Sequence, residues 1–183
     1  MLENVRSLHN GPTPSGRFLN TVYRPGEPAG DTELAALSEV LGRLDAEAAR
    51  TLGQFYRQCR ALEFGWEHLQ VGKLDVGGAR IVDIDQLTAG LRAMPDDYIP
   101  FDFPEDDVVV IRHEAGRLRL YFSEADAAEE FVPLSLDVPR YFRLLDECRG
   151  LFPWQKATMG GNVQDEFLLD LERLFPSADR SLF

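Results

Sequence analysis

The clearest pattern of hydrophobic and polar positions along the chain lies in residues 108–122. Residues 108–111 form a β-branched run, and Leu118, Leu120 and Phe122 alternate with more polar residues. Residues 114–116 form a short connection between the two stretches, and it ends in Gly116, where a tight turn needs a positive φ. The pattern predicts a β-hairpin with one strand buried on both faces and the other half exposed.

The first part of the chain has helical periodicity. After Asp31, which is a good N-cap residue, four leucines recur at helical spacing: Leu34, Leu37, Leu41 and Leu44. Asp45 can cap a second helix, whose apolar stripe continues through Leu52 to Cys59 and ends near residue 61. We therefore expect a helical hairpin whose role is packing.

Chain breakers and helix caps separate shorter elements in the middle of the chain. Residues 64–78 combine Trp66 with several glycines and predict short strands or a loop at a sheet edge, with Trp66 as a core anchor. Residues 80–82 are predicted as a strand, and Asp83 with Gln86 three residues later begins a helix. We therefore interpret Asp83 and Asp85 as helix-start residues rather than metal ligands.

Two further helices are predicted toward the C-terminus, and an arm near the N-terminus. Asp137 before a Val-Pro pair begins a helix that ends near Gly150 and should cover the sheet. Asn162 begins a final amphipathic helix that ends before Pro176.

Residues 10–30 contain four Gly and four Pro, too many breakers for a helix and too irregular a pattern for a strand interior. This segment is expected to be an arm or linker.

The length and composition fit one globular domain with extensions. The chain has 183 residues, of which 44% are hydrophobic. No window approaches the roughly 18 apolar residues of a membrane span, and the first 20 residues do not resemble a signal peptide. We therefore expect a cytoplasmic protein without membrane association. Cys59 and Cys148 each lie in an apolar helical stripe and are predicted to be buried thiols.

The chain is strongly acidic. Its 31 Asp and Glu residues against 19 Lys and Arg give a net charge of −12, which repels phosphate backbones and anionic lipid surfaces. We therefore expect no nucleic-acid ligand. The charge serves either solubility alone or the electrostatic attraction of a basic protein partner.

The most acidic segment directly precedes the predicted hairpin. Residues 93–111 contain no Lys or Arg and carry six carboxylates. Three interpretations are open: a solvated loop, a protein-binding loop, or a divalent-cation site. A cation site needs converging ligands, and the spaced motif D-x-D-x-D-G is absent. In a protein-binding loop, the carboxylates and aromatic side chains would contact the partner: Asp96, Asp97, Tyr98, Phe101, Asp102, Phe103, Glu105, Asp106 and Asp107.

The sequence carries no catalytic signature. His9, His68 and His113 lack metal-ligand spacing with one another or with either cysteine. Phosphate-binding glycine loops and nucleophile motifs are absent. His113, near Glu114 at the end of a predicted strand, is the best candidate base, although a surface turn histidine is the preferred interpretation. We expect no catalytic residue, no bound metal and no cofactor.

Several segments, in their order along the chain, resemble the SMI1/KNR4 superfamily, also called the SUKH domains. The resemblance is carried by residues 44–62 with the aromatic pair Phe55 and Tyr56, by residues 81–87, and by the Ile-Pro-Phe sequence at 99–102 that leads to the hairpin. Residues 106–107 and 116–118 stand where the family has its acidic lead-in and its hairpin turn. The similarity covers residues 34–154.

The resemblance implies an α+β fold in which helices cover a central, mainly antiparallel sheet. It divides the chain into an N-terminal arm (1–30), an SMI1/KNR4-like domain (31–157) and a C-terminal helical extension (158–183). It also implies a non-enzymatic intracellular immunity protein that binds and neutralises a cognate bacterial toxin. The alternatives are an intracellular scaffold or regulatory domain, and a metal-dependent hydrolase that uses the acidic segment.

Overall fold

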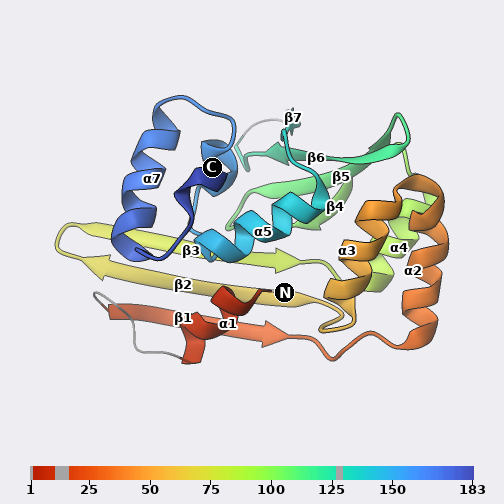
Figure 1. Cartoon of the computed structure of the whole chain (residues 1–183), viewed down its shortest axis with the longest axis horizontal. Coiled ribbons are helices and arrows are strands. Elements are labelled where there is room, and N and C mark those ends of the chain that lie inside the picture. The colour runs from red at the N-terminus through yellow and green to blue at the C-terminus, as the bar shows by residue number, and fades with distance from the viewer. Residues whose placement is uncertain (1, 11–16, 127–129) are drawn as a thin grey trace.

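The computed structural model describes residues 2–10, 17–126 and 130–183. Within these ranges the chain is an α+β protein with two antiparallel sheets and seven α-helices (Figure 1). Sheet A contains, in spatial order, β1 (Arg17–Pro25), β2 (Leu62–Gln70) and β3 (Lys73–Ile81). Sheet B contains β4 (Ile99–Asp102), β5 (Val108–Glu114), β6 (Arg117–Ser123) and β7 (Val132–Pro133).

The helices gather on one side and at one end of the sheets (Figure 1). Helices α2, α3 and α4 lie together at one end, whereas α1, α5 and α7 lie over the strands on the viewer's side. The helices are α1 (Glu3–Asn10), α2 (Asp31–Leu44), α3 (Ala46–Tyr56), α4 (Ile84–Ala93), α5 (Val138–Cys148), α6 (Trp154–Ala157) and α7 (Asn162–Leu174), followed by the 3-10 helix η1 (Arg180–Leu182). In the described part of the chain, none of them is long and apolar enough to cross a membrane.

The predicted hairpin is confirmed as β5 and β6. Glu114 pairs with Arg117 across a two-residue turn in which Ala115 has a φ of 50° and Gly116 a φ of 77°. Positive φ at both central positions is the turn geometry that matches the twist of a β-hairpin. The hairpin register therefore follows from the turn.

The two sheets are joined through the backbone. The Val82 N–H donates to the Phe101 carbonyl at 3.0 Å, and the Phe103 N–H donates to the Arg80 carbonyl at 3.2 Å. Further along the same edge of β3, the Gly78 N–H donates to the Gly150 carbonyl at 3.0 Å. The edge of β3 that faces away from β2 is therefore covered, and the sheets share one core.

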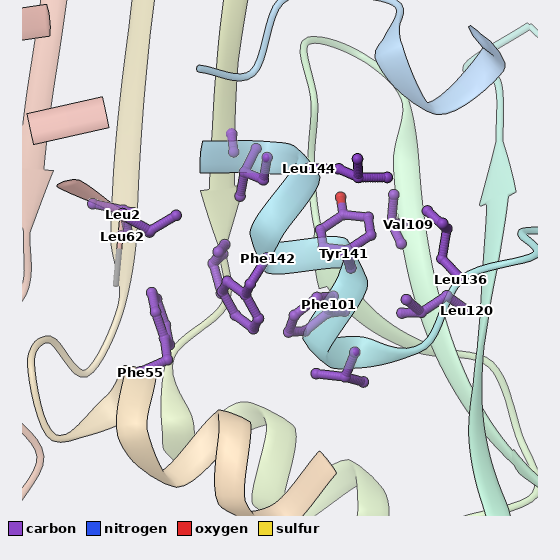
Figure 2. Close-up of a cluster of buried hydrophobic side chains, with 14 of the residues drawn as sticks. Leu2, Phe55, Leu62, Phe101, Val109, Leu120, Leu136, Tyr141, Phe142 and Leu144 are labelled. Atoms are coloured by element: carbon purple, nitrogen blue, oxygen red, sulfur yellow. The ribbon is translucent and has the colours of Figure 1, made fainter. Parts of the chain in front are cut away.

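Helix α5 packs over the region where the two sheets meet (Figure 2). Tyr141, Phe142 and Leu144 are buried there. The Phe142 ring lies 4.9 Å from that of Phe55 in α3 and 5.8 Å from that of Phe101 in β4, measured between centroids. Aromatic side chains bury large apolar areas, so this contact set makes α5 central to the core.

The predicted helices are confirmed, with two shifts at their starts and one at an end: α3 ends at Tyr56, not near residue 61, so Cys59 lies beyond the helix. Asp83 caps α4 by accepting from the Asp85 N–H, and Asp137 caps α5 by accepting from the Arg140 N–H. Asp31 and Asn162 are instead the first residues of their helices, and the N-caps are the glycines before them. At α2 the Gly30 N–H donates to the Glu33 carboxylate at 2.6 Å, so the cap bond comes from inside the helix.

Asp45 connects the helical hairpin to sheet B. Its Oδ1 accepts from the N–H groups of Glu47 and Ala48, both at 3.0 Å, and so begins α3. Its Oδ2 accepts from the Leu118 N–H in β6 at 3.1 Å. One carboxylate therefore satisfies backbone donors of two elements that are distant in sequence.

Replacing Asp45 by alanine is expected to lower the free energy of unfolding by about 2 kcal/mol, because the helix loses its cap and the Leu118 N–H loses its acceptor. Urea titration of the two proteins measures the difference. Asp45→Asn is the matched control, since its single carbonyl oxygen can keep the cap, and we expect roughly half the loss. An Asp45→Ala protein as stable as the original would contradict this role.

The prediction of an irregular arm over residues 10–30 is wrong for Arg17–Pro25, which form β1. This strand pairs antiparallel with β2, and its one proline is its last residue, where a missing N–H does no harm. Residues 11–16 lie outside the described residues. The division into arm, domain and extension remains a prediction, although the buried core includes Val5 near one end and Leu171 near the other.

The prediction of short strands or an edge loop over residues 64–78 is also wrong. Strands β2 and β3 are nine residues each, and β2 is the central strand of sheet A. Gly77 lies within β3 directly opposite Trp66, and a Cβ there would overlap the Trp66 indole. The glycine therefore makes room for a ring rather than a turn. Trp66 is a buried anchor, as predicted, and its Nε1 donates to the Arg149 carbonyl at 2.8 Å.

Helix α7 attaches to sheet A through a group of charged side chains. The buried Asp75 of β3 has its Oδ2 2.7 Å from Arg173 Nη2 in α7 and 3.4 Å from the Nδ1 of the buried His68. Lys73 lies 2.6 Å from Asp170, also in α7. Buried charges need such pairing, so these contacts fix the helix against the β2–β3 hairpin.

Candidate protein-binding face

The acidic segment does not form one surface, because β4 divides it. Asp96 and Asp97 precede β4, whereas Glu105 and Asp106 follow it, and all four are exposed. The other predicted contact residues of the segment differ in burial: Phe101 and Asp102 are 0% exposed and Asp107 is 7% exposed. These three side chains are therefore interior groups and cannot form the surface of a binding loop.

Asp102 has a structural role at the junction of the two sheets. Its Oδ1 accepts from the Arg80 N–H at 2.8 Å, and its Oδ2 accepts from the Tyr141 hydroxyl at 2.7 Å. Burial raises the pKa of this carboxyl to about 6, although the Tyr141 hydrogen bond opposes that rise. Asp102 therefore ties β4 to β3 and α5.

Glu105 and Asp106 border a different surface from Asp96 and Asp97. They line a hollow of about 320 Å³ together with Gly65 and Phe103, over the outer side of sheet A. The half-buried Phe103 ring lies 4.5 Å from the Arg80 guanidinium. Glu105 has a φ of 53°. Its side chain is exposed but partly shielded from water, and this desolvation, followed by the neighbouring carboxylates, raises its pKa.

An aromatic cluster surrounds Tyr98. Its ring stacks on Phe131 with centroids 4.2 Å apart and meets the edge of Tyr121 at 5.2 Å. The neighbours Ile99 and Leu120 belong to the core, and side chains alternate along a strand. Tyr98 and Tyr121 therefore lie on the face of sheet B that points away from the core, where all three rings are half-buried.

Arg112 holds this cluster in place. Its guanidinium lies 5.0 Å from the Tyr98 ring centroid, and its Nη1 donates to the Tyr98 hydroxyl at 3.3 Å. Its Nε donates to the Asp96 carbonyl at 2.7 Å, and its Nη1 lies 3.2 Å from Glu114. We call Tyr98, Tyr121, Phe131 and Arg112 the Tyr98 face; Asp96 and Asp97 lie at its border.

The structure thus brings three of the predicted contact residues together, Asp96, Asp97 and Tyr98, and adds partners that were missed. Tyr121 alternates with core residues in the predicted hairpin, which could have indicated an outward position. Its proximity to Tyr98 depends on the β4–β5–β6 register, and that of Phe131 depends on the return of the chain at β7. Neither pairing has a local sequence signal.

The candidate catalytic groups lie in protected positions. His113 is within β5 rather than in a turn, and its half-buried side chain has Nδ1 3.3 Å from Asp96 Oδ1. Cys59 and Cys148 are buried free thiols, as predicted. Burial raises the pKa of Cys59 to about 11 and that of Cys148 further, so both are protonated at neutral pH.

Metal-binding side chains do not converge in the part of the chain that the structure describes. No group of three or more His, Cys, Asp or Glu residues there is placed to hold a metal ion. The carboxylates of the acidic segment are instead distributed between the border of the Tyr98 face, the hollow over sheet A and the interior.

Comparison with protein-family models, with curated proteins and with solved structures finds no match to this chain. The fold is that of an α+β protein with two antiparallel sheets. On one of these sheets, a face turned away from the core combines aromatic rings with charged side chains.

Proposed function

We propose that this chain is a non-enzymatic protein-binding module, an immunity protein that neutralises a cognate bacterial toxin. The observation that carries the proposal is the Tyr98 face, three half-buried rings and an arginine with exposed carboxylates at the border. Tyr and Arg are the residue types that dominate binding energy in protein interfaces. Carboxylates beside them accelerate the approach of a basic partner.

Two further observations support this proposal. The net charge of −12 favours a partner with basic groups over one with phosphates. Antiparallel sheets with helices packed on one side also agree with the architecture that the SMI1/KNR4 resemblance implies. Membership of that superfamily is part of the proposal, and the toxin would be the basic partner.

Reversing the charges at Asp96 and Asp97 is expected to slow association with the partner by about tenfold or more and to reduce its salt dependence. Affinity capture from the organism that encodes the chain, compared between the original protein and Asp96→Lys/Asp97→Lys, identifies the partner. Its association rate is then measured with purified proteins at several salt concentrations. Growth of cells that produce the captured protein tests whether the chain neutralises it.

Asp165→Lys/Glu166→Lys is the matched control, because these two adjacent exposed residues of α7 lie on another element. It introduces the same charge change and should leave capture and association within about twofold of the original. Equal slowing by both double variants would mean that net charge alone acts. A captured polypeptide that binds all three proteins at the same rate would remove Asp96 and Asp97 from the interface.

A further inference from the structure

The face of sheet B that points away from the core also carries a basic row. Along β6, the core residues Leu118 and Leu120 alternate with Arg117, Arg119 and Tyr121. The two arginines and the tyrosine therefore share the outer side of the strand. Arg117 and Arg119 are exposed. On a chain with a net charge of −12, this row is a local exception.

The strand register places two like charges opposite each other. Arg119 pairs with Arg112 across the β5–β6 ladder, and like charges in such a pair destabilise a sheet. Arg112 has its own anion, since its Nη1 lies 3.2 Å from Glu114. Among the described residues, no carboxylate oxygen lies within 4.0 Å of the guanidinium nitrogens of Arg117 or Arg119. Arg117 lies opposite Glu114 in the same ladder, but the ion pair of Glu114 is with Arg112, so both cations remain available to carboxylates from another molecule.

The spacing of the row specifies the form of such a molecule. Side chains two residues apart on one strand are separated by about 6.6 Å along the strand, and any extended segment has the same repeat. Carboxylates at alternate positions of an extended segment would thus lie over Arg117 and Arg119. The next position on the same side would lie over Tyr121 and the aromatic cluster, where an apolar side chain fits.

We propose that the outer side of β6 binds an extended protein segment in which every second residue faces the strand. Two successive residues on that side of the segment are acidic, and the next one on the same side is aromatic or large and apolar. Each guanidinium would hold a carboxylate through paired hydrogen bonds. This inference rests on the proposed protein-binding function and deepens it. The partner presents an acidic strand beside the basic region that meets Asp96 and Asp97.

A nucleic acid fits the same row less well. Its phosphates could pair with the arginines, and its bases could stack on the rings. Each additional phosphate would, however, approach a chain with 31 acidic residues, Asp96 and Asp97 at the border of this face among them. A short peptide with two carboxylates carries much less charge and places it only over the row.

The test uses the full chain and a synthetic peptide with the sequence Ser-Glu-Ser-Glu-Ser-Phe-Ser, blocked at both ends. Titration followed by amide NMR at about 20 mM salt should give a Kd on the order of 100 μM, with shifts centred on Arg117, Arg119 and Tyr121. Arg117→Gln/Arg119→Gln should weaken binding by about tenfold or more. The control Arg50→Gln/Arg57→Gln removes two exposed charges at α3 and should stay within about twofold.

An isomer of the peptide with its two glutamates adjacent tests the spacing and should bind at least about fivefold more weakly. Equal binding by both isomers would overturn the proposal. So would tighter binding of oligothymidylate at the same residues, or a dimer of the original protein that Arg117→Gln/Arg119→Gln converts to monomer. Thermal melts that match the original confirm that each variant is folded, and Arg117→Lys/Arg119→Lys offers a second, more conservative variant.

A lysine version of the peptide separates this proposal from the proposed function. If it binds near Asp96 and Asp97 while the glutamate peptide produces no localised shifts, recognition of a basic partner stands and the acidic strand is refuted. If the glutamate peptide binds the β6 row as expected while Asp96→Lys/Asp97→Lys has no effect on partner capture, the row stands and the acidic border is refuted.

Discussion

Replacing Gly77 by alanine is expected to lower the free energy of unfolding by about 3 kcal/mol, at the upper end of the usual cost of overpacking. The new Cβ would overlap the indole of Trp66, which lies directly opposite in the β2–β3 ladder. Trp66 is 2% exposed, so the ring has no free space to enter. Its displacement would also break the hydrogen bond from Nε1 to the Arg149 carbonyl.

A double-mutant cycle with Trp66→Leu isolates this contact. The Gly77→Ala change should cost much less in the Trp66→Leu background, since the smaller side chain leaves room for the Cβ. Gly65→Ala in the neighbouring strand is the control, because its Cβ would meet nothing closer than the Gly77 carbonyl oxygen at 3.8 Å. Urea titration measures all the variants. The same cost in both backgrounds would show that the indole is not the obstacle.

The second large effect is a pH dependence that arises from Asp102. Relative to Asp102→Asn, the original protein should lose about 2 kcal/mol of stability as the pH rises from about 4 to 7. The folded pKa is raised to about 6 from an ordinary 3.8, so between these values the folded state holds a proton that the unfolded state has released. Stability therefore falls with pH over this window, and below it both states are protonated.

Urea titrations of both proteins at several pH values between 4 and 7.5 give this difference directly, because the other titrating groups are common to the two. Tyr141→Phe supplies a further check. It removes the hydroxyl that donates to Asp102 Oδ2 at 2.7 Å, and loss of a bond to the charged form should raise the pKa of Asp102 further. A stability difference that stays constant across the pH range would rule out a raised pKa.

Elements with local signals could be predicted from the sequence. The β5–β6 hairpin has its turn at Ala115 and Gly116, and helices α3, α4 and α5 begin at aspartate caps, as at Asp45. Strand β1 could not be predicted in this way, because its stability comes from pairing with a distant strand. The glycines of β3 resembled turn residues, whereas Gly77 accommodates an indole that a sequence pattern does not place.

The candidate site could be predicted only in part, because only some of its residues have a local sequence signal. Tyr98 with Asp96 and Asp97 stood out as an aromatic residue beside carboxylates, and these residues lie together on the structure. Burial of Asp102 depends on Tyr141, 39 residues away, and charge patterning treats it as equivalent to its exposed neighbours. Long-range contacts decide which of several similar carboxylates face solvent.

The two outer strands of the joined sheets, β1 and β7, bear on how a partner can be recognised. The register of β1 shifts between Leu19 and Val22, and the strand ends in Pro25. Strand β7 is two residues long and ends in Pro133. Irregular, short and proline-terminated strands are poor templates for another chain to extend the sheet. Binding by strand addition, and fibril growth by the same route, is therefore disfavoured, and selectivity is left to side chains on the faces.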